Sequence, residues 1–147
     1  MLSTTTSVEL HVCTLLVGDL LLGLPLEAVS EVVPAQVLTP VPLADPAVLG
    51  LFNLRGRVVT AVDARTRLGM PARSEDEYGV HVIVTDRGEA TSLVVDRTSD
   101  VLTLLGAERE AVPETVPVSI RRLTTAAYQR PHGLLLVLDL TLTLSLA

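Results

Sequence analysis

Three apolar segments each end in an aspartate, and these aspartates are the first candidates for chemistry. Asp63 follows residues 58–62, Asp96 follows residues 91–95, and Asp139 follows residues 134–138. Carboxylates brought together could act as an acid–base pair or as ligands of a metal ion. At the end of a strand, however, aspartate commonly accepts backbone N–H groups of the turn or helix that follows. We therefore interpret the three residues as structural caps, with an enzyme that uses them as a less favoured alternative.

The histidines and the cysteine do not form a catalytic or metal-binding pattern. His11 and His81 lie in strand-like runs, and neither they nor His132 have the close spacing to other ligands that zinc requires. Cys13 is the only cysteine and lies in an apolar run, so we expect a buried thiol, as is compatible with a reducing cytosol. A Gly-rich phosphate loop and a nucleophile elbow are both absent from the sequence. The sequence therefore predicts no catalytic residue, no metal site and no cofactor.

Arg55 differs from these residues because it lies in the short unit Asn53-Leu54-Arg55-Gly56 between two apolar runs. Such a unit is typical of a tight connection between strands, which would present the guanidinium at a surface. The side chain could stabilise the turn through a salt bridge or carbonyl contacts. It could also offer its planar donor fork to a carboxylate or to backbone carbonyls of a partner. The two interpretations do not exclude each other.

The composition of the 147-residue chain favours a single ordinary domain and argues against nucleic acid as a partner. Hydrophobic residues make up 48% of the chain, which is enough to fill a core. The net charge of −6 would oppose phosphate binding, and aromatic residues, on which bases could stack, make up only 2%. The start of the chain carries no basic export signal, and the apolar run of residues 133–147 is shorter than the roughly 20 residues of a membrane span. We expect a cytoplasmic protein that does not insert into a membrane.

Short apolar segments separated by turn residues predict a mainly β protein. Residues 8–17 and 20–26 are expected to form a hairpin around Gly18-Asp19, and residues 80–85 and 91–95 a second strand pair. Residues 101–105 should form another strand. Residues 27–33 fit either one helical turn or an irregular strand, because their spacing does not separate the two. Short strands at regular spacing are typical of barrels or a sandwich.

Helices are expected to be few and short. Residues 64–70 and 119–128 are predicted helices, the second of them capped by Ser119, and Asp45-Pro46-Ala47 could begin a third. The last element, residues 134–142, is predicted as a strand, and leucines then alternate with Thr and Ser up to Leu146. Residues 1–7 are expected to be a disordered polar leader.

The order of several short motifs resembles that of a CheW domain. In the first half these motifs are Gly23-Leu24-Pro25-Leu26, Val29-Ser30-Glu31-Val32, Pro40-Val41-Pro42, Val48-Leu49-Gly50, Asn53-Leu54-Arg55-Gly56, Val62-Asp63-Ala64-Arg65 and Leu68-Gly69. In the second half they are Leu93-Val94-Val95-Asp96, Ser99-Asp100-Val101-Leu102 and Leu138-Asp139. The resemblance covers residues 8–144, nearly the whole chain.

The resemblance implies a mainly β fold of two SH3-like five-stranded β-barrels packed together, with a few short helices. Residues 8–147 would then be a single CheW-like domain made of two intertwined barrel subdomains. It also implies a non-catalytic adaptor of bacterial chemotaxis or a related chemosensory pathway. Such an adaptor couples the cytoplasmic tip of a methyl-accepting chemoreceptor to the regulatory domain of the histidine kinase CheA, within membrane-bound receptor clusters.

Carried over by position, the partner-binding residues are Val29, Glu31, Gly50, Asn53, Arg55 and Gly56. The alternative interpretation is an SH3-like β-barrel that binds peptides or proteins outside chemosensory signalling.

Overall fold

The computed structural model describes residues 8–74 and 77–146, so the leader expected over residues 1–7 lies outside the described residues. In chain order the elements are β1 (Glu9–Val17), β2 (Leu20–Pro25), the 3₁₀ turn η1 (Leu26–Ala28), β3 (Val29–Val33), β4 (Val48–Leu54), β5 (Arg57–Asp63), α1 (Ala64–Arg67), β6 (Val80–Asp86), β7 (Glu89–Val95), β8 (Arg97–Leu105), η2 (Gly106–Glu108), α2 (Val118–Arg121), β9 (Thr124–Arg130), β10 (Gly133–Leu138) and α3 (Leu140–Leu144). The mainly β character expected from the sequence is confirmed.

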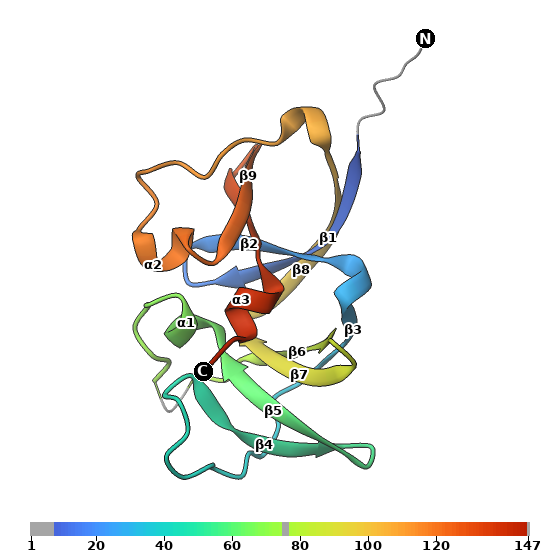
Figure 1. Cartoon of the computed structure of the whole chain (residues 1–147), viewed down its shortest axis with the longest axis vertical. Coiled ribbons are helices and arrows are strands. Elements are labelled where there is room, and N and C mark those ends of the chain that lie inside the picture. The colour runs from blue at the N-terminus through green and yellow to red at the C-terminus, as the bar shows by residue number, and fades with distance from the viewer. Residues whose placement is uncertain (1–7, 75–76, 147) are drawn as a thin grey trace.

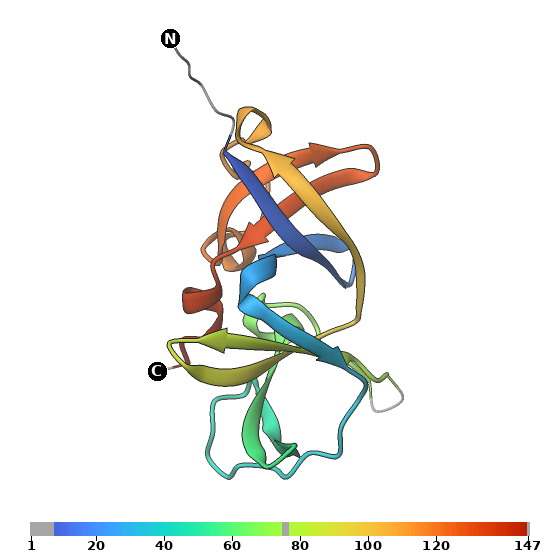
Figure 2. The ribbon, with the colours of Figure 1, turned by 90° about the vertical axis from the view of Figure 1, so that its right-hand side faces the viewer.

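The strands form two five-stranded sheets. Sheet 1 has the order β8-β1-β2-β10-β9, and sheet 2 has the order β3-β6-β7-β5-β4. The chain starts sheet 1 with one hairpin, builds the whole of sheet 2, and then returns to complete sheet 1. Sheet 1 occupies the upper part of the molecule in Figures 1 and 2, and sheet 2 occupies the lower part.

The expected closed barrels are not confirmed. Within the described residues, β8 and β9 are the two edges of sheet 1, β3 and β4 are those of sheet 2, and no ladder joins either pair of edges. The edge of β4 instead receives the β3–β4 connection through an isolated bridge between Thr39 and Leu51, whose backbone groups exchange two hydrogen bonds of 2.8 Å. The two sheets therefore have the expected number of strands, but their edges remain separate.

The two sheets have the same topology, shifted along the chain. Strand β3, the hairpin β4–β5 and the hairpin β6–β7 of sheet 2 correspond to β8, the hairpin β9–β10 and the hairpin β1–β2 of sheet 1. The parallel pairing of β5 with β7 corresponds to that of β10 with β2. A register shift also interrupts β3 and β8 at the same place, beside Ser30-Glu31 and Ser99-Asp100. Positions in the hairpins β1–β2 and β6–β7 can therefore be compared by counting from the residue pairs that close their turns.

The largest group of buried side chains lies between the two sheets. It includes Leu15 and Leu22 of sheet 1, Val82 and Leu93 of sheet 2, and Cys13, which is buried as expected. Two smaller groups lie on the outer side of this core, one within each sheet. Because the Val- and Leu-rich strands bury one face against the other sheet, the relative position of the sheets is set mainly by apolar packing.

The segments before β4 and after β5 show how local chemistry decides between helix, turn and strand. Residues 27–33 contain both expected alternatives, because the turn η1 runs directly into the irregular strand β3. Asp45 accepts a hydrogen bond of 2.8 Å from the backbone N–H of Ala47, but the segment forms a turn and no helix. The helix expected over residues 64–70 is present as the shorter α1.

Two predictions for the C-terminal third were wrong. The helix predicted over residues 119–128 stops at Arg121, because residues 124–130 pair with β10 as strand β9. The strand predicted over residues 134–142 ends at Leu138, because Asp139 caps helix α3 by accepting a hydrogen bond of 3.0 Å from the backbone N–H of Leu142. No helix within residues 8–74 and 77–146 is long and apolar enough to cross a membrane.

Candidate functional site

The turn between β4 and β5 has a backbone that few side chains tolerate. Leu54 and Arg57 close the hairpin, and the two residues between them have positive φ, 51° at Arg55 and 88° at Gly56. Positive φ at both central residues is the requirement of a type I′ turn, which costs a non-glycine residue free energy. The side chain of Asn53 supports the turn by accepting a hydrogen bond of 2.9 Å from the backbone N–H of Gly56. The result is an arginine held at the tip of a rigid hairpin.

Arg55 forms an ion pair with Glu31, and the pair joins the two edges of sheet 2. The Arg55 side chain is 67% exposed and that of Glu31 is 34% exposed. Glu31 belongs to β3, whereas Arg55 follows β4, so the contact bridges strands at opposite edges of the sheet order. The pair borders a hollow of about 220 Å³ whose lining includes Val59 and Ile83. We call Glu31, Asn53, Arg55 and Gly56 the turn site.

The other two residues carried over from the family lie elsewhere. Val29 is half-buried and packs against the core between the sheets. Gly50 is buried with φ 147°, and a Cβ there would lie 2.6 Å from the backbone oxygen of Thr39. Gly50 thus permits the close approach of the β3–β4 connection to β4 and offers no side chain to a partner. The structure brings four of the six expected residues together.

A second Arg-Gly turn provides an internal reference for the turn site. Arg87 and Gly88 connect β6 and β7 with φ 53° and 81°, nearly the angles of Arg55 and Gly56. Because β5 and β7 run parallel, both turns lie at the same end of sheet 2. Arg87 is also exposed, but within the described residues it takes part in no ion pair. The two turns therefore share a backbone and differ in what the arginine contacts.

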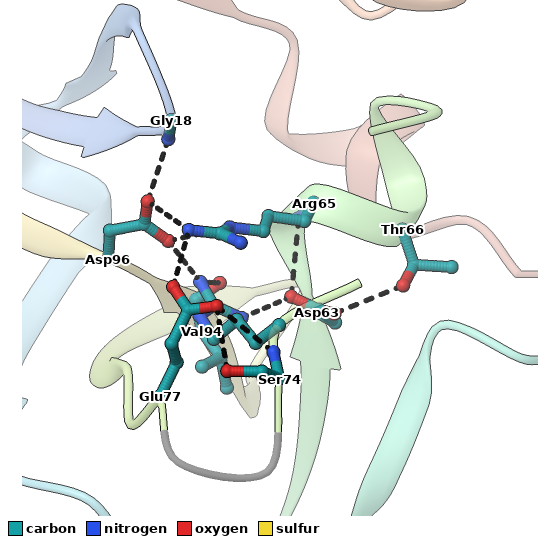
Figure 3. A network of polar contacts seen from close by, with 9 residues as sticks. Gly18, Asp63, Arg65, Thr66, Ser74, Glu77, Val94 and Asp96 are labelled. Carbon is teal, nitrogen blue, oxygen red and sulfur yellow. Dashed lines mark hydrogen bonds and ion pairs between the residues drawn. The ribbon is translucent and has the colours of Figure 1, made fainter. Parts of the chain in front are cut away.

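The strand-ending aspartates of β5 and β7 meet two arginines in a polar network at the opposite end of sheet 2 (Figure 3). Asp63 and Asp96 come close because their strands are parallel neighbours that end at the same edge. Arg73, from the segment between α1 and β6, lies 2.5 Å from Asp63 Oδ1 through Nη1 and 2.8 Å from Asp96 Oδ1 through Nη2. Arg65 of α1 donates to both oxygens of Asp96, over 3.0 Å and 2.8 Å. We call these four residues the arginine network.

The arginine network also connects the two sheets. The backbone N–H of Gly18, in the hairpin turn of sheet 1, donates a hydrogen bond of 2.7 Å to Asp96 Oδ2 (Figure 3). Burial alone would raise the pKa of Asp96, but hydrogen bonds from Arg65, the Gly18 N–H and Arg73 lower it to about 2. The same contact with Asp96 raises the pKa of Arg65. Asp96 is therefore charged near pH 7, and both of its carboxylate oxygens already accept hydrogen bonds within the protein.

The interpretation of the aspartates as caps is confirmed for Asp63 and Asp139. Asp63 accepts a hydrogen bond of 3.2 Å from the Arg65 N–H at the start of α1, and Asp139 caps α3, which follows β10. Within residues 8–74 and 77–146, no group of three or more His, Cys, Asp or Glu side chains could hold a metal ion. Sequence reasoning missed the role of Arg65 and Arg73. The pattern Asp63-Ala64-Arg65 at a strand–helix junction was the available signal for the first, and nothing local marks the second.

Comparison with known proteins gives one consistent result. The family model described as "CheW-like domain" matches residues 11–147. A protein named "Chemotaxis protein CheW" from Rhizobium meliloti is 35% identical over 98 residues, which are 67% of this chain and 63% of the relative. A protein of the same name from Helicobacter pylori is 27% identical over 101 residues, or 69% of this chain and 61% of the relative. The chain thus matches less than two thirds of the length of these curated relatives.

A solved structure agrees with the fold. The crystal structure of the scaffolding protein TtCheW from Thermoanaerobacter tengcongensis superimposes with a TM-score of 0.79 and covers 90% of both chains. The two sequences are 21% identical, so this similarity concerns the arrangement of the chain alone.

Proposed function

This chain belongs to the family of CheW-like domains, and from that premise we propose that it is a non-catalytic adaptor that couples chemoreceptors to a histidine kinase. The observation that carries the proposal is the turn site. A strained hairpin turn holds an exposed guanidinium, which can exchange its intramolecular carboxylate for one on a partner.

The energetics of the Glu31–Arg55 pair favour such an exchange. An exposed ion pair contributes only about 0–1 kcal/mol to folding, so separating it costs little. Once a partner excludes water, hydrogen bonds to the same guanidinium contribute about 1.5–3 kcal/mol each.

We further propose the finer assignments that the family resemblance implies. The partners are the regulatory domain of a CheA-type kinase and the cytoplasmic tip of a methyl-accepting chemoreceptor, and the protein acts in the cytoplasm at membrane-bound receptor clusters. Residues 8–147 act as one unit in which each sheet is a variant of the SH3-like barrel. The shared core between the sheets and the link from Asp96 to Gly18 support this single unit.

A bridging experiment tests the proposal against an SH3-like module outside chemosensory signalling. An immobilised chemoreceptor cytoplasmic fragment is incubated with the kinase, with and without this protein. A coupling adaptor is expected to retain the kinase on the resin only when all three components are present. If the protein binds neither the receptor fragment nor the kinase, the proposed function is wrong and the peptide-binding module becomes the better account.

A further inference from the structure

The cores of the two sheets differ at one pair of equivalent positions. His81 lies five residues before Asp86, which closes the β6–β7 hairpin, and Ser92 lies three residues after Glu89 on the other strand. The same steps in the β1–β2 hairpin, from Val17 and Leu20, lead to Val12 and Gly23. Sheet 2 thus has a buried imidazole and a hydroxyl where sheet 1 has an isopropyl group and a hydrogen. The fold itself does not need a polar pair at this place.

One ring nitrogen of His81 forms a hydrogen bond within the protein, and the other has no hydrogen-bond partner among the described residues. The ring is buried, with 3% of the residue exposed, and packs edge-to-face on Phe52 with 4.9 Å between ring centroids. Its Nδ1 lies 2.7 Å from Ser92 Oγ, and no hydrogen bond within the described residues involves Nε2. The His81 side chain also lines an opening beside it.

The opening next to His81 is a hollow at the end of sheet 2 opposite the turn site. Its volume is about 220 Å³, and its lining includes His81, Leu38, Leu49, Tyr78 and Val94. Leu49 and Tyr78 form an exposed rim, with 38% and 78% of each residue accessible. An apolar cavity of about 150 Å³ is known to hold benzene. The hollow therefore has room for a group of one ring with a substituent.

The charges around the hollow favour an uncharged ligand. Arg73 lines the hollow, but Asp63 and Asp96 already neutralise it, and Glu77, which also lines the hollow, pairs with Arg65 over 3.4 Å. Burial, and then the charge of Arg73, lower the pKa of His81, so the ring is neutral near pH 7. Because Arg65 and Arg73 are both already paired with carboxylates, an anion would find no free counter-charge on either of them, whereas a neutral hydroxyl or carbonyl can form one hydrogen bond with Nε2.

We propose that this hollow binds a small uncharged apolar group with one hydroxyl or carbonyl oxygen, which forms a hydrogen bond with His81 Nε2. The group comes from a free molecule or from a side chain of a partner. The site is independent of the turn site, because the two lie at opposite ends of sheet 2. The buried His81–Ser92 pair and the hollow then belong to one binding site, and this site accounts for the difference between the two sheets.

Phenol is a suitable probe because it is an uncharged apolar ring with one hydroxyl group. The equivalent residues of sheet 1 show which substitutions should remove the site. His81→Val combined with Ser92→Gly copies the Val12–Gly23 pair, so the double variant is expected to fold. In an NMR titration followed through the backbone amide signals of Gly79 and Val94, which line the hollow in both proteins, phenol should cause a saturable shift in the wild type and bind at least tenfold more weakly to the double variant. Toluene, which lacks the oxygen, should bind both proteins alike, and benzoate should bind the wild type more weakly than phenol.

Two results would overturn the proposal: no saturable shift in the wild type, or equal phenol affinity in the wild type and the double variant. If the double variant does not fold, Leu49→Trp at the rim should block phenol, and unchanged phenol binding by that variant would also overturn the site. The bridging experiment with the double variant then identifies the source of the group. Lost bridging indicates a partner side chain, and retained bridging indicates a free molecule.

Discussion

The turn site and the arginine network use the same chemical groups in opposite surroundings. At the turn site one guanidinium and one carboxylate meet at the surface, and the Arg55 side chain is 67% exposed. In the arginine network, the side chains of Arg73 and Asp63 are 9% and 4% exposed. Water solvates a separated surface pair at little cost, but a buried charge that loses its partner stays uncompensated. Burial therefore decides whether an ion pair is exchangeable or structural.

The largest expected effect follows from breaking the buried pair. Arg73→Ala leaves Asp63 and part of Asp96 without a counter-charge, so the free energy of unfolding should fall by about 3–5 kcal/mol. Urea denaturation followed by circular dichroism measures the loss. The same truncation at exposed Arg55 is the control and should cost less than about 1 kcal/mol. Equal losses in the two variants would abolish the distinction between the sites.

Acid should weaken the arginine network through Asp96. Its pKa is about 2 in the folded protein and near 3.8 for an ordinary aspartate, so the unfolded state binds more protons between these values. The contribution is complete above about pH 5 and is lost as the pH falls from 4 towards 2, amounting to about 2 kcal/mol. The measurement is the free energy of unfolding against pH for wild type and Asp96→Asn. The variant should show a shallower acid slope, and parallel slopes would contradict the assignment.

A smaller effect is expected where an aspartate only caps a helix. Asp139 accepts one backbone hydrogen bond at the start of α3 and has no arginine partner within the described residues. Asp139→Ala should therefore lower the free energy of unfolding by about 1 kcal/mol, as for other N-caps. Thermal denaturation checks this value beside Arg73→Ala. A loss as large as that of Arg73→Ala would show that Asp139 does more than cap the helix.

The sequence predicted elements whose determinants are local. Gly18-Asp19 and Asn53-Leu54-Arg55-Gly56 mark hairpin turns because their chemistry is contained in a few residues. The errors arose where distant pairing overrides a local pattern. Thr124 to Tyr128 suit a short helix, but β10 offers them a strand ladder, while the alternating leucines after Asp139 suggest a strand that the cap converts to α3.

The candidate site was predictable in part for the same reason. The turn at Arg55 could be recognised from neighbouring residues, but its partner Glu31 lies 24 positions away, and only the family resemblance suggested it. Arg73 lies in a polar loop without any distinctive neighbour, and it reaches Asp63 and Asp96 only because β5 and β7 run parallel. Parallel pairing depends on the whole sheet, so no short segment of sequence encodes it.

If Arg55 serves a partner more than the fold, its loss should weaken binding without unfolding the protein, and the second Arg-Gly turn provides the control. The measurement is the affinity of wild type, Arg55→Ala, Arg55→Lys and Arg87→Ala for the receptor fragment and the kinase by calorimetry, beside the melting temperature of each free protein. Arg87→Ala removes an arginine from the same backbone geometry and should leave both affinities unchanged.

Arg55→Ala should weaken at least one of the two complexes by about 1–3 kcal/mol, while the free energy of unfolding falls by less than about 1 kcal/mol. Arg55→Lys should restore only part of the affinity, because an ammonium group lacks the planar donor fork. Wild-type affinity of Arg55→Ala for both partners would remove Arg55 from the interface. A melting temperature many degrees lower in Arg55→Ala alone would instead make the Glu31–Arg55 pair a structural bridge of sheet 2.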